Sequence, residues 1–264
     1  MLIDQEGGRV QRLGPPHWPE YPPASQFAAA FGEDTAQAKA DLAENAAAIA
    51  HDLADLGITV DCWPVLDLPQ AGADPIIGDR ALGTEPNAVA ALGAVIIDGL
   101  HAGGVSPVIK HIPGHGRALV DSHKALPVVE TDVPTLQATD FAPFRMLNTA
   151  PWAMTAHVVY TAVDADNCAT FSETVVRDVI RGDIGFDGLL ISDDLSMHAL
   201  SGGFAERTER ALAAGCDVVL HCNGDMAEMA PVAEAAHIMT EDAQARFAGA
   251  EKVRRAAVGA ETDT

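Results

Sequence analysis

Basic residues, cysteine motifs and long apolar runs are all scarce in this sequence. Lys and Arg together number 16 against 38 Asp and Glu, so the formal net charge is −22 at pH 7. Nucleic acids and anionic membrane surfaces are themselves negatively charged and would repel such a protein. We therefore expect neither of them as a partner.

Membrane and export signals are lacking as well. No run approaches the roughly 18 apolar residues that a membrane span needs, and the first residues lack the basic and then apolar pattern of a secretory signal. The four cysteines (Cys62, Cys168, Cys216 and Cys222) form no CxxC pair and no dense framework. Such cysteines are typical of reduced thiols, so we expect a cytoplasmic protein.

Cofactor and metal motifs are missing too. The sequence contains no P-loop and no HExxH, and the Gly-Gly turn at 7–8 does not match GxGxxG. His111 and His115 have the spacing of zinc ligands on a helix, but Pro113 and Gly114 between them prevent that helix. We expect neither a cofactor nor a metal.

Short apolar runs alternate with helical patterns along the chain, which predicts a parallel α/β fold. The expected strands are 2–3, 58–66, 105–110, 153–159, 188–192 and 217–221. The expected helices are 35–56, 87–102, 133–147 and 172–181. With 264 residues, 48% of them hydrophobic, the chain is long enough for one large barrel domain over 1–264.

Polar residues follow almost every apolar run. They include Asp4, Asp67, Lys110, His157, Asp193 and His221. An open sheet gathers its ligands at one switch point, whereas a barrel collects residues from all its strand ends at one mouth. We therefore predict a (β/α)8 TIM-type barrel. Only six strands are evident where eight are needed, and the first begins almost at Met1, so the first strand and helix of the barrel are expected to be lacking.

Titratable groups are densest between residues 110 and 123. Lys110 and His111 end an apolar strand, and Asp121 lies two residues before His123 on a loop. This spacing allows the carboxylate to orient the imidazole and raise its proton affinity. Taken alone, however, the Asp121–His123 pair is better explained as an exposed loop pair that has no function.

Two adjacent carboxylates, Asp193 and Asp194, end the apolar run 189–192. A carboxylate in this position is a nucleophile, a metal ligand or a helix N-cap. Ser-Asp-Asp before a helical pattern is typical of capping, and we interpret Asp194 as a cap. Near the N-terminus, Asp4 and Arg12 flank a tight turn whose charges suit sugar hydroxyls or a carboxylate. Arg80 is equally consistent with a structural ion pair.

Together these segments resemble glycoside hydrolase family 3, and within it the NagZ-type β-N-acetylglucosaminidases. The matching segments are DQEGGRVQR (4–12), PVLDL (64–68), GDRALG (78–83), KHIPGHG with DSH (110–123), MTAHVVY (154–160) and SDDLSM (192–197). The resemblance covers nearly the whole chain and implies the same barrel fold.

The resemblance also implies a role for each matching residue. Asp193 becomes the nucleophile, and His123, supported by Asp121, becomes the acid/base. The implied sugar-binding residues are Asp4, Arg12, Arg80, Lys110 and His111. The implied reaction is removal of terminal GlcNAc from GlcNAc-1,6-anhydro-MurNAc peptides in cell-wall recycling, by a monomer whose partner is its carbohydrate substrate.

Two alternatives remain open. One is a glycoside phosphorylase or a β-glucosidase-like enzyme, because an imidazole in place of a second carboxylate reduces repulsion of an anionic acceptor such as phosphate. The other is an inactive sugar-binding fragment, because a missing strand exposes two sheet edges and part of the core.

Overall fold

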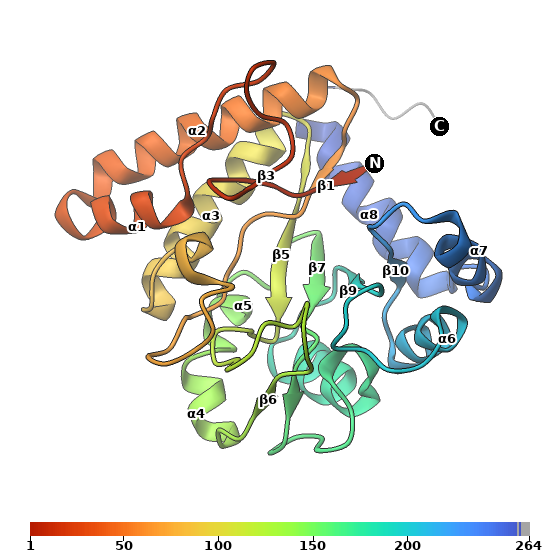
Figure 1. The fold of residues 1–264 in the computed structure, drawn as a ribbon. Coiled ribbons are helices and arrows are strands. Elements are labelled where there is room, and N and C mark those ends of the chain that lie inside the picture. The colour runs from red at the N-terminus through yellow and green to blue at the C-terminus, as the bar shows by residue number, and fades with distance from the viewer. Residues whose placement is uncertain (258, 260–264) are drawn as a thin grey trace.

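A computed structural model describes residues 1–257 and 259, and its centre is a six-stranded sheet (Figure 1). In spatial order the strands are β1 (Leu2–Ile3), β4 (Val60–Asp61), β5 (Ser106–Ile112), β7 (Trp152–Thr155), β9 (Leu189–Asp194) and β10 (Val218–Leu220). Every neighbouring pair is parallel. Spatial order follows chain order, which is how a (β/α)8 barrel is wound. All six predicted strands are therefore confirmed, with shifted ends.

The sheet ends at β1 on one side and at β10 on the other. Within the described residues each of these strands has a single neighbour in the sheet. An apolar cavity of about 310 Å³ lies beside them, lined by Leu2, Trp152, Ile191, Val218, Val219, Leu220, Met239 and Phe247. Since a closed barrel has eight strands, the six strands form an incomplete barrel.

Helices cover the outside of this sheet. They are α1 (Ala24–Glu33), α2 (Thr35–Asp55), α3 (Pro86–Ala102), α4 (Val133–Ala138), α5 (Ala142–Met146), α6 (Phe204–Ala214), α7 (Met226–Ala235) and α8 (Glu241–Ala257). Two 3-10 turns (Gly78–Arg80 and Ala169–Phe171) and a π-helix (Val175–Asp183) complete the helical elements. Figure 1 shows α1, α2 and α3 packed together on one flank and α6, α7 and α8 on the other.

The long helix α2 illustrates how the sequence specifies these elements. Its fully buried residues Leu42, Ala46, Ile49 and Leu53 recur at helical spacing and face the core. The Asp34 side chain accepts hydrogen bonds from the backbone N–H groups of residues 36 and 37 and so caps the first turn. The helix is followed by a glycine at position 57 with φ of 72°, a conformation that only glycine adopts easily.

One predicted helix is wrong in its extent. The pattern over 133–147 predicts a continuous helix, but the structure has two short ones, α4 and α5. Pro143 explains the break, because it has no N–H to donate to the carbonyl of Thr139, and its ring would clash with that carbonyl. The helix expected over 172–181 is a π-helix, and the Ser172 hydroxyl accepts from the N–H of Val175, as its capping position predicts.

Helices α6, α7 and α8 were not among the predicted elements, and neither were the following three features. A hairpin of β2 (Gln5–Gly7) and β3 (Val10–Gln11) follows β1 directly. A parallel pair of β6 (Val128–Val129) and β8 (Val159–Tyr160) lies beyond the sheet. Helix α1 follows the Pro-rich segment 15–23 without a side-chain cap, so the sequence gives little local signal for its start.

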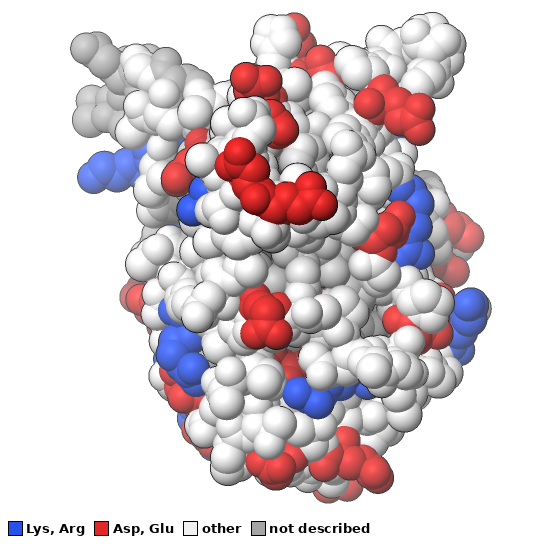
Figure 2. Space-filling model, turned by 90° about the vertical axis from the view of Figure 1, so that its left-hand side faces the viewer, with Lys and Arg blue, Asp and Glu red and all other residues white. Residues whose placement is uncertain are grey.

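Acidic side chains dominate the surface in Figure 2, where they form a band in the upper half and a second group at the lower edge. Basic side chains occur on that face in a few small groups. Among the described residues, no helix is both long and apolar enough to cross a membrane.

Candidate active site

A cavity of about 180 Å³ lies at the carboxyl ends of the strands. The sequence-predicted residues that line it are Asp4, Arg12, Arg80, Lys110, His111, His123 and Asp193. Its other lining residues include Arg9, His115, Ser122, Met154, Asp194, Met197 and Cys222. Because parallel strands end on the same side of the sheet, residues more than a hundred positions apart meet here. Asp121 lies directly behind this wall, bound to His123.

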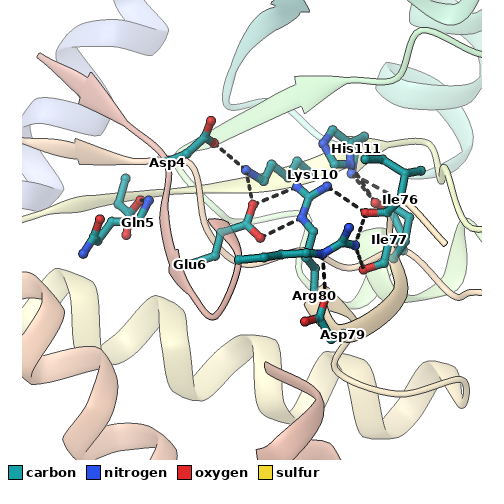
Figure 3. Close-up of polar contacts among 12 residues, drawn as sticks. Asp4, Gln5, Glu6, Ile76, Ile77, Asp79, Arg80, Lys110 and His111 are labelled. Atoms are coloured by element: carbon teal, nitrogen blue, oxygen red, sulfur yellow. Dashed lines mark hydrogen bonds and ion pairs between the residues drawn. The ribbon is translucent and has the colours of Figure 1, made fainter. Parts of the chain in front are cut away.

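Lys110 is the centre of a buried ionic cluster (Figure 3). Its Nζ lies 2.8 Å from Oδ1 of Asp4 and 2.6 Å from Oε1 of Glu6. Glu6 also accepts two hydrogen bonds of 2.8 Å from Arg80, one from Nε and one from Nη2. Arg12 completes the cluster with a 3.2 Å contact to Oδ2 of Asp4. An ammonium group has three donors, so Lys110 retains one N–H for a ligand.

Charge pairing decides the ionisation of this cluster. Burial by itself would raise the pKa of Asp4 and Glu6, but the adjacent Lys110, with Arg12 or Arg80, holds both values below the usual range. The same two carboxylates raise the pKa of Lys110 against the effect of its burial. The cluster is therefore fully charged at neutral pH, a fixed set of donors and acceptors that suits sugar hydroxyls.

His111 is held by a buried carboxylate. Oδ2 of Asp67 lies 2.7 Å from Nδ1 of His111, and the same carboxylate accepts from the backbone N–H of His111 and, at 2.6 Å, of His115. Burial opposes ionisation of Asp67, but His111 and the N–H donors keep its pKa below normal. Because a carboxylate only accepts, Nδ1 carries a proton and Nε2 is the free nitrogen of the ring.

His123 has a similar partner in a very different setting. Its Nδ1 lies 2.8 Å from Oδ1 of Asp121, which also accepts from the His123 backbone N–H at 2.9 Å. The His123 side chain is 59% exposed, whereas that of His111 is 8% exposed. These hydrogen bonds lower the pKa of Asp121 although its partial burial acts in the opposite direction. Nε2 of His123 is thus free to take up and release a proton.

Asp193 is the penultimate residue of β9 and lines the same cavity. Burial raises its pKa, but the neighbouring His157 and His111 and the N–H of Asp194 outweigh that effect and lower it. The carboxylate is consequently ionised at neutral pH. A half-buried carboxylate without an Arg or Lys ion pair is suited to nucleophilic attack.

The capping interpretation of Asp194 is wrong. The residues after it form a turn, and the next helix, α6, begins at Phe204. Asp194 instead stabilises this turn: its carboxylate accepts from the N–H and hydroxyl of Ser196 and, at 3.1 Å, from the N–H of Cys222. It therefore links the ends of β9 and β10.

His157 is fully buried next to the end of β9. Its Nε2 lies 3.1 Å from the carbonyl oxygen of Asp194, and its Nδ1 lies 2.7 Å from the Thr170 hydroxyl. A carbonyl cannot donate, so Nε2 carries the proton. Burial lowers the pKa of His157, which keeps it neutral. His157 is therefore a buried histidine with a hydrogen-bond partner at each ring nitrogen.

Three functional residues were not assigned to the site from the sequence, although Asp67 was noted as a polar residue after an apolar run. Glu6 joins Lys110 to Arg80, and Asp67 holds His111. Arg9 binds Asp79 at 2.6 Å and the carbonyls of the loop that carries Arg80. The available signal was their position, since Glu6 and Asp67 follow apolar runs, but which of several carboxylates faces a cation depends on the fold. Among the described residues no group of three or more His, Cys, Asp or Glu is arranged to hold a metal ion.

Comparison with known sequences identifies relatives over most of the chain. Residues 1–255 match the glycosyl hydrolase family 3 N terminal domain. A beta-hexosaminidase of Thiobacillus denitrificans is 39% identical over 84% of this chain and 62% of its own length. One from Alkalilimnicola ehrlichii is 40% identical over 84% of this chain and 64% of its own length. The chain thus spans less than two thirds of the length of these two relatives.

Solved structures agree with this result. NagZ from Neisseria gonorrhoeae, in complex with N-trifluoroacetyl-D-glucosamine, superposes with a TM-score of 0.84 at 34% identity, over 97% of this chain and 76% of that one. A family 3 β-N-acetylglucosaminidase from a Paenibacillus species gives a TM-score of 0.83 at 32% identity, over 100% and 51%. The predicted barrel fold is therefore confirmed. The chain belongs to glycosyl hydrolase family 3.

Proposed function

We propose that this protein is a retaining exo-β-N-acetylglucosaminidase. One observation carries the proposal: an ionised carboxylate, Asp193, and a carboxylate-supported imidazole, His123, line the same cavity as a ring of sugar-binding charges. A retaining glycosidase requires one nucleophile and one group that both gives and takes a proton. The activity of the relatives is consistent with this assignment.

In the first step, Asp193 forms a bond to the anomeric carbon as the bond to the leaving oxygen breaks. His123, protonated on Nε2, transfers that proton to the departing oxygen. The products of this step are the free aglycone, a covalent glycosyl-Asp193 and a neutral His123.

In the second step, neutral His123 removes a proton from water while the oxygen of that water attacks the anomeric carbon. The bond to Asp193 breaks, which regenerates the carboxylate and the protonated imidazole. Two inversions leave the sugar in its original β configuration. Before the first step and after the second, both ring nitrogens of His123 carry a proton, and Asp121 stabilises the resulting positive charge.

The ionic cluster holds the sugar during both steps. Lys110 and Arg12 donate to hydroxyls, Asp4 and the free nitrogen of His111 accept, and Arg80 is held by Glu6 at the wall of the cavity. These groups are fixed before the ligand arrives, so they favour a distorted transition state without having to reorganise.

We further propose that the substrate is a peptidoglycan fragment with a terminal GlcNAc on 1,6-anhydro-MurNAc, cleaved in the cytoplasm during cell-wall recycling. The small cavity suits removal of a single terminal sugar. All four cysteines are unpaired in the described part of the chain, which agrees with a reducing compartment.

Turnover of an aryl β-GlcNAc with and without phosphate tests the proposal. Release of GlcNAc in both conditions is expected, and predominant GlcNAc 1-phosphate would identify a phosphorylase instead. A preference for aryl β-glucoside would favour a β-glucosidase-like enzyme. Absence of turnover together with retained GlcNAc binding would indicate the inactive sugar-binding fragment.

The covalent intermediate can be tested separately with His123→Ala. An activated aryl leaving group needs little protonation, so the first step remains fast while the second, which needs a base, becomes slow. The glycosyl-enzyme should accumulate, and mass spectrometry of the digested protein should find the sugar on the peptide that contains Asp193. A sugar on any other peptide, or an intermediate that persists in Asp193→Ala, would refute the assignment of the nucleophile.

A further inference from the structure

Ser122 and the adjacent Asp121 are buried in a loop whose flanking residues 119–120 and 123–124 are exposed. Ser122 is 3% exposed, whereas Leu119 is 68% exposed and the Lys124 side chain 79% exposed. The loop carries both Asp121 and His123, one on each side of this serine. A polar side chain is buried in such a place only if its contacts compensate for the loss of water.

Two contacts hold Ser122. Its hydroxyl oxygen lies 3.1 Å from Nε2 of His115, and its carbonyl accepts at 3.1 Å from the N–H of Ala199, in the segment that follows the nucleophile strand. The side chain of Ser122 therefore connects the loop to the segment that follows β5, and its backbone connects the loop to the segment that follows β9.

His115 is itself fixed firmly. Its N–H donates to Asp67 at 2.6 Å, and the carbonyl oxygen of the next residue, Gly116, accepts from the N–H of Gln70 at 2.9 Å. A Cβ at position 116 would lie 2.0 Å from the carbonyl oxygen of Leu68, so the backbone packs there at a distance that only glycine permits. The imidazole of His115 thus projects from a rigid base.

The hydrogen bond has a defined direction. Nδ1 of His115 is buried and has no partner, so the tautomer that leaves no N–H unpaired carries its proton on Nε2. Nε2 then donates to the oxygen of Ser122. The rigid imidazole is consequently a donor that fixes the residue between Asp121 and His123.

We propose that the His115–Ser122 hydrogen bond is a latch that holds His123 in position for proton transfer. His115 and Ser122 are then positioning residues: they act on the reaction through His123 and not by contact with the reacting atoms. This inference rests on the proposed acid/base role of His123.

The first test does not depend on activity. Ser122→Ala and His115→Leu remove the hydrogen bond, and trypsin cleavage after Lys124 in the folded protein should become about tenfold faster or more, because local opening exposes the loop. Ser106→Ala is a matched control, since Ser106 is fully buried but its hydroxyl has no partner. Cleavage at the wild-type rate in both latch variants would overturn the proposal.

The second test compares leaving groups. Loss of acid catalysis matters most for a poor leaving group, so Ser122→Ala should lower kcat/KM about tenfold or more for an alkyl β-GlcNAc and by less than about threefold for a dinitrophenyl β-GlcNAc. His115→Leu should cause the same selective loss, and His115→Gln, which retains an N–H near the position of Nε2, should cause a smaller one. In a His123→Ala background, Ser122→Ala should cause no further selective loss.

Equal losses on both substrates, or a selective loss that persists without His123, would overturn the proposal. If the wild-type protein cleaves neither substrate, the proposed function is wrong while the proteolysis result still decides whether the latch exists.

Discussion

Two Asp–His pairs serve the same cavity with almost the same geometry. The Nδ1–Oδ distance is 2.7 Å in Asp67–His111 and 2.8 Å in Asp121–His123. The first pair is buried against β5, and the second has a mostly exposed imidazole on a loop. A buried imidazole is suited to hold a ligand in one place, whereas an exposed one exchanges protons with water between steps. The hydrogen bond to a carboxylate is common to both histidines, so it does not explain their different proposed roles. The difference in solvent access of the two imidazoles does.

The sharpest test of this contrast replaces each imidazole in turn. His123→Ala should lower kcat/KM for an alkyl β-GlcNAc by about 10²–10⁴-fold, with a far smaller loss for a dinitrophenyl leaving group. His111→Ala should lower kcat/KM by a similar factor for both substrates, because a binding contact does not depend on the leaving group. Steady-state kinetics with the two substrates gives the answer. A leaving-group dependence in the His111 variant would contradict the proposed separation of roles.

Stability should distinguish the two carboxylates. Asp67→Ala leaves buried N–H donors without an acceptor and should lower the free energy of unfolding by about 3–5 kcal/mol. In Asp121→Ala the lost carboxylate is also buried, but its imidazole partner is 59% exposed and can bind water instead, so the loss should be smaller, about 1–2 kcal/mol. Urea denaturation followed by circular dichroism measures both. Equal losses in the free energy of unfolding would mean that the different burial of the two imidazoles has no effect on how much each pair stabilises the protein.

The pH dependence of the free energy of unfolding tests the role of His115. This residue connects the two pairs, because its N–H binds Asp67 and its ring binds Ser122, between Asp121 and His123. Burial and the adjacent His111 lower its pKa from 6.5 to about 4. The unfolded chain binds this proton more tightly, so the stabilisation is complete above pH 6.5 and is lost as pH falls from 6.5 to about 4. His115→Gln should flatten the wild-type curve in this window by up to about 3 kcal/mol. The exposed His51 provides a control in His51→Gln, and an unchanged slope in the His115 variant would refute the prediction.

The smallest effect is expected for Lys124, which forms an exposed contact with Asp121 of the Asp121–His123 pair. Lys124 lies 3.4 Å from Asp121, and its side chain is 79% exposed. Lys124→Ala should change the free energy of unfolding by less than about 0.5 kcal/mol, because water screens such pairs. It should also change kcat/KM by less than about twofold. A larger kinetic change would mean that the ion pair helps to orient Asp121.

The sequence predicted the strands because each combines an apolar run with a polar end. The roles proposed for Asp193, Asp121 and His123 came from the resemblance to family 3, since Asp121 and His123 lie on a loop and follow no such run.

The sequence did not predict the break before Pro143 from periodicity alone, since the apolar pattern continues across it. Nor did it separate the roles of Glu6, Asp67 and Asp194. Glu6 and Asp67 pair with residues of β5, and Asp194 accepts from a turn residue and from the segment after β10, so these partners depend on the fold.

The shared ammonium of Lys110 has a consequence for the choice of sugar. Two of its three N–H groups are taken by Asp4 and Glu6, so the remaining one points in a single direction. An epimer whose hydroxyl lies on the opposite side of the ring would leave that buried donor unpaired, at a cost of about 1–3 kcal/mol. By occupying two of its N–H groups, the two carboxylates would thereby also make Lys110 selective for the orientation of a single sugar hydroxyl.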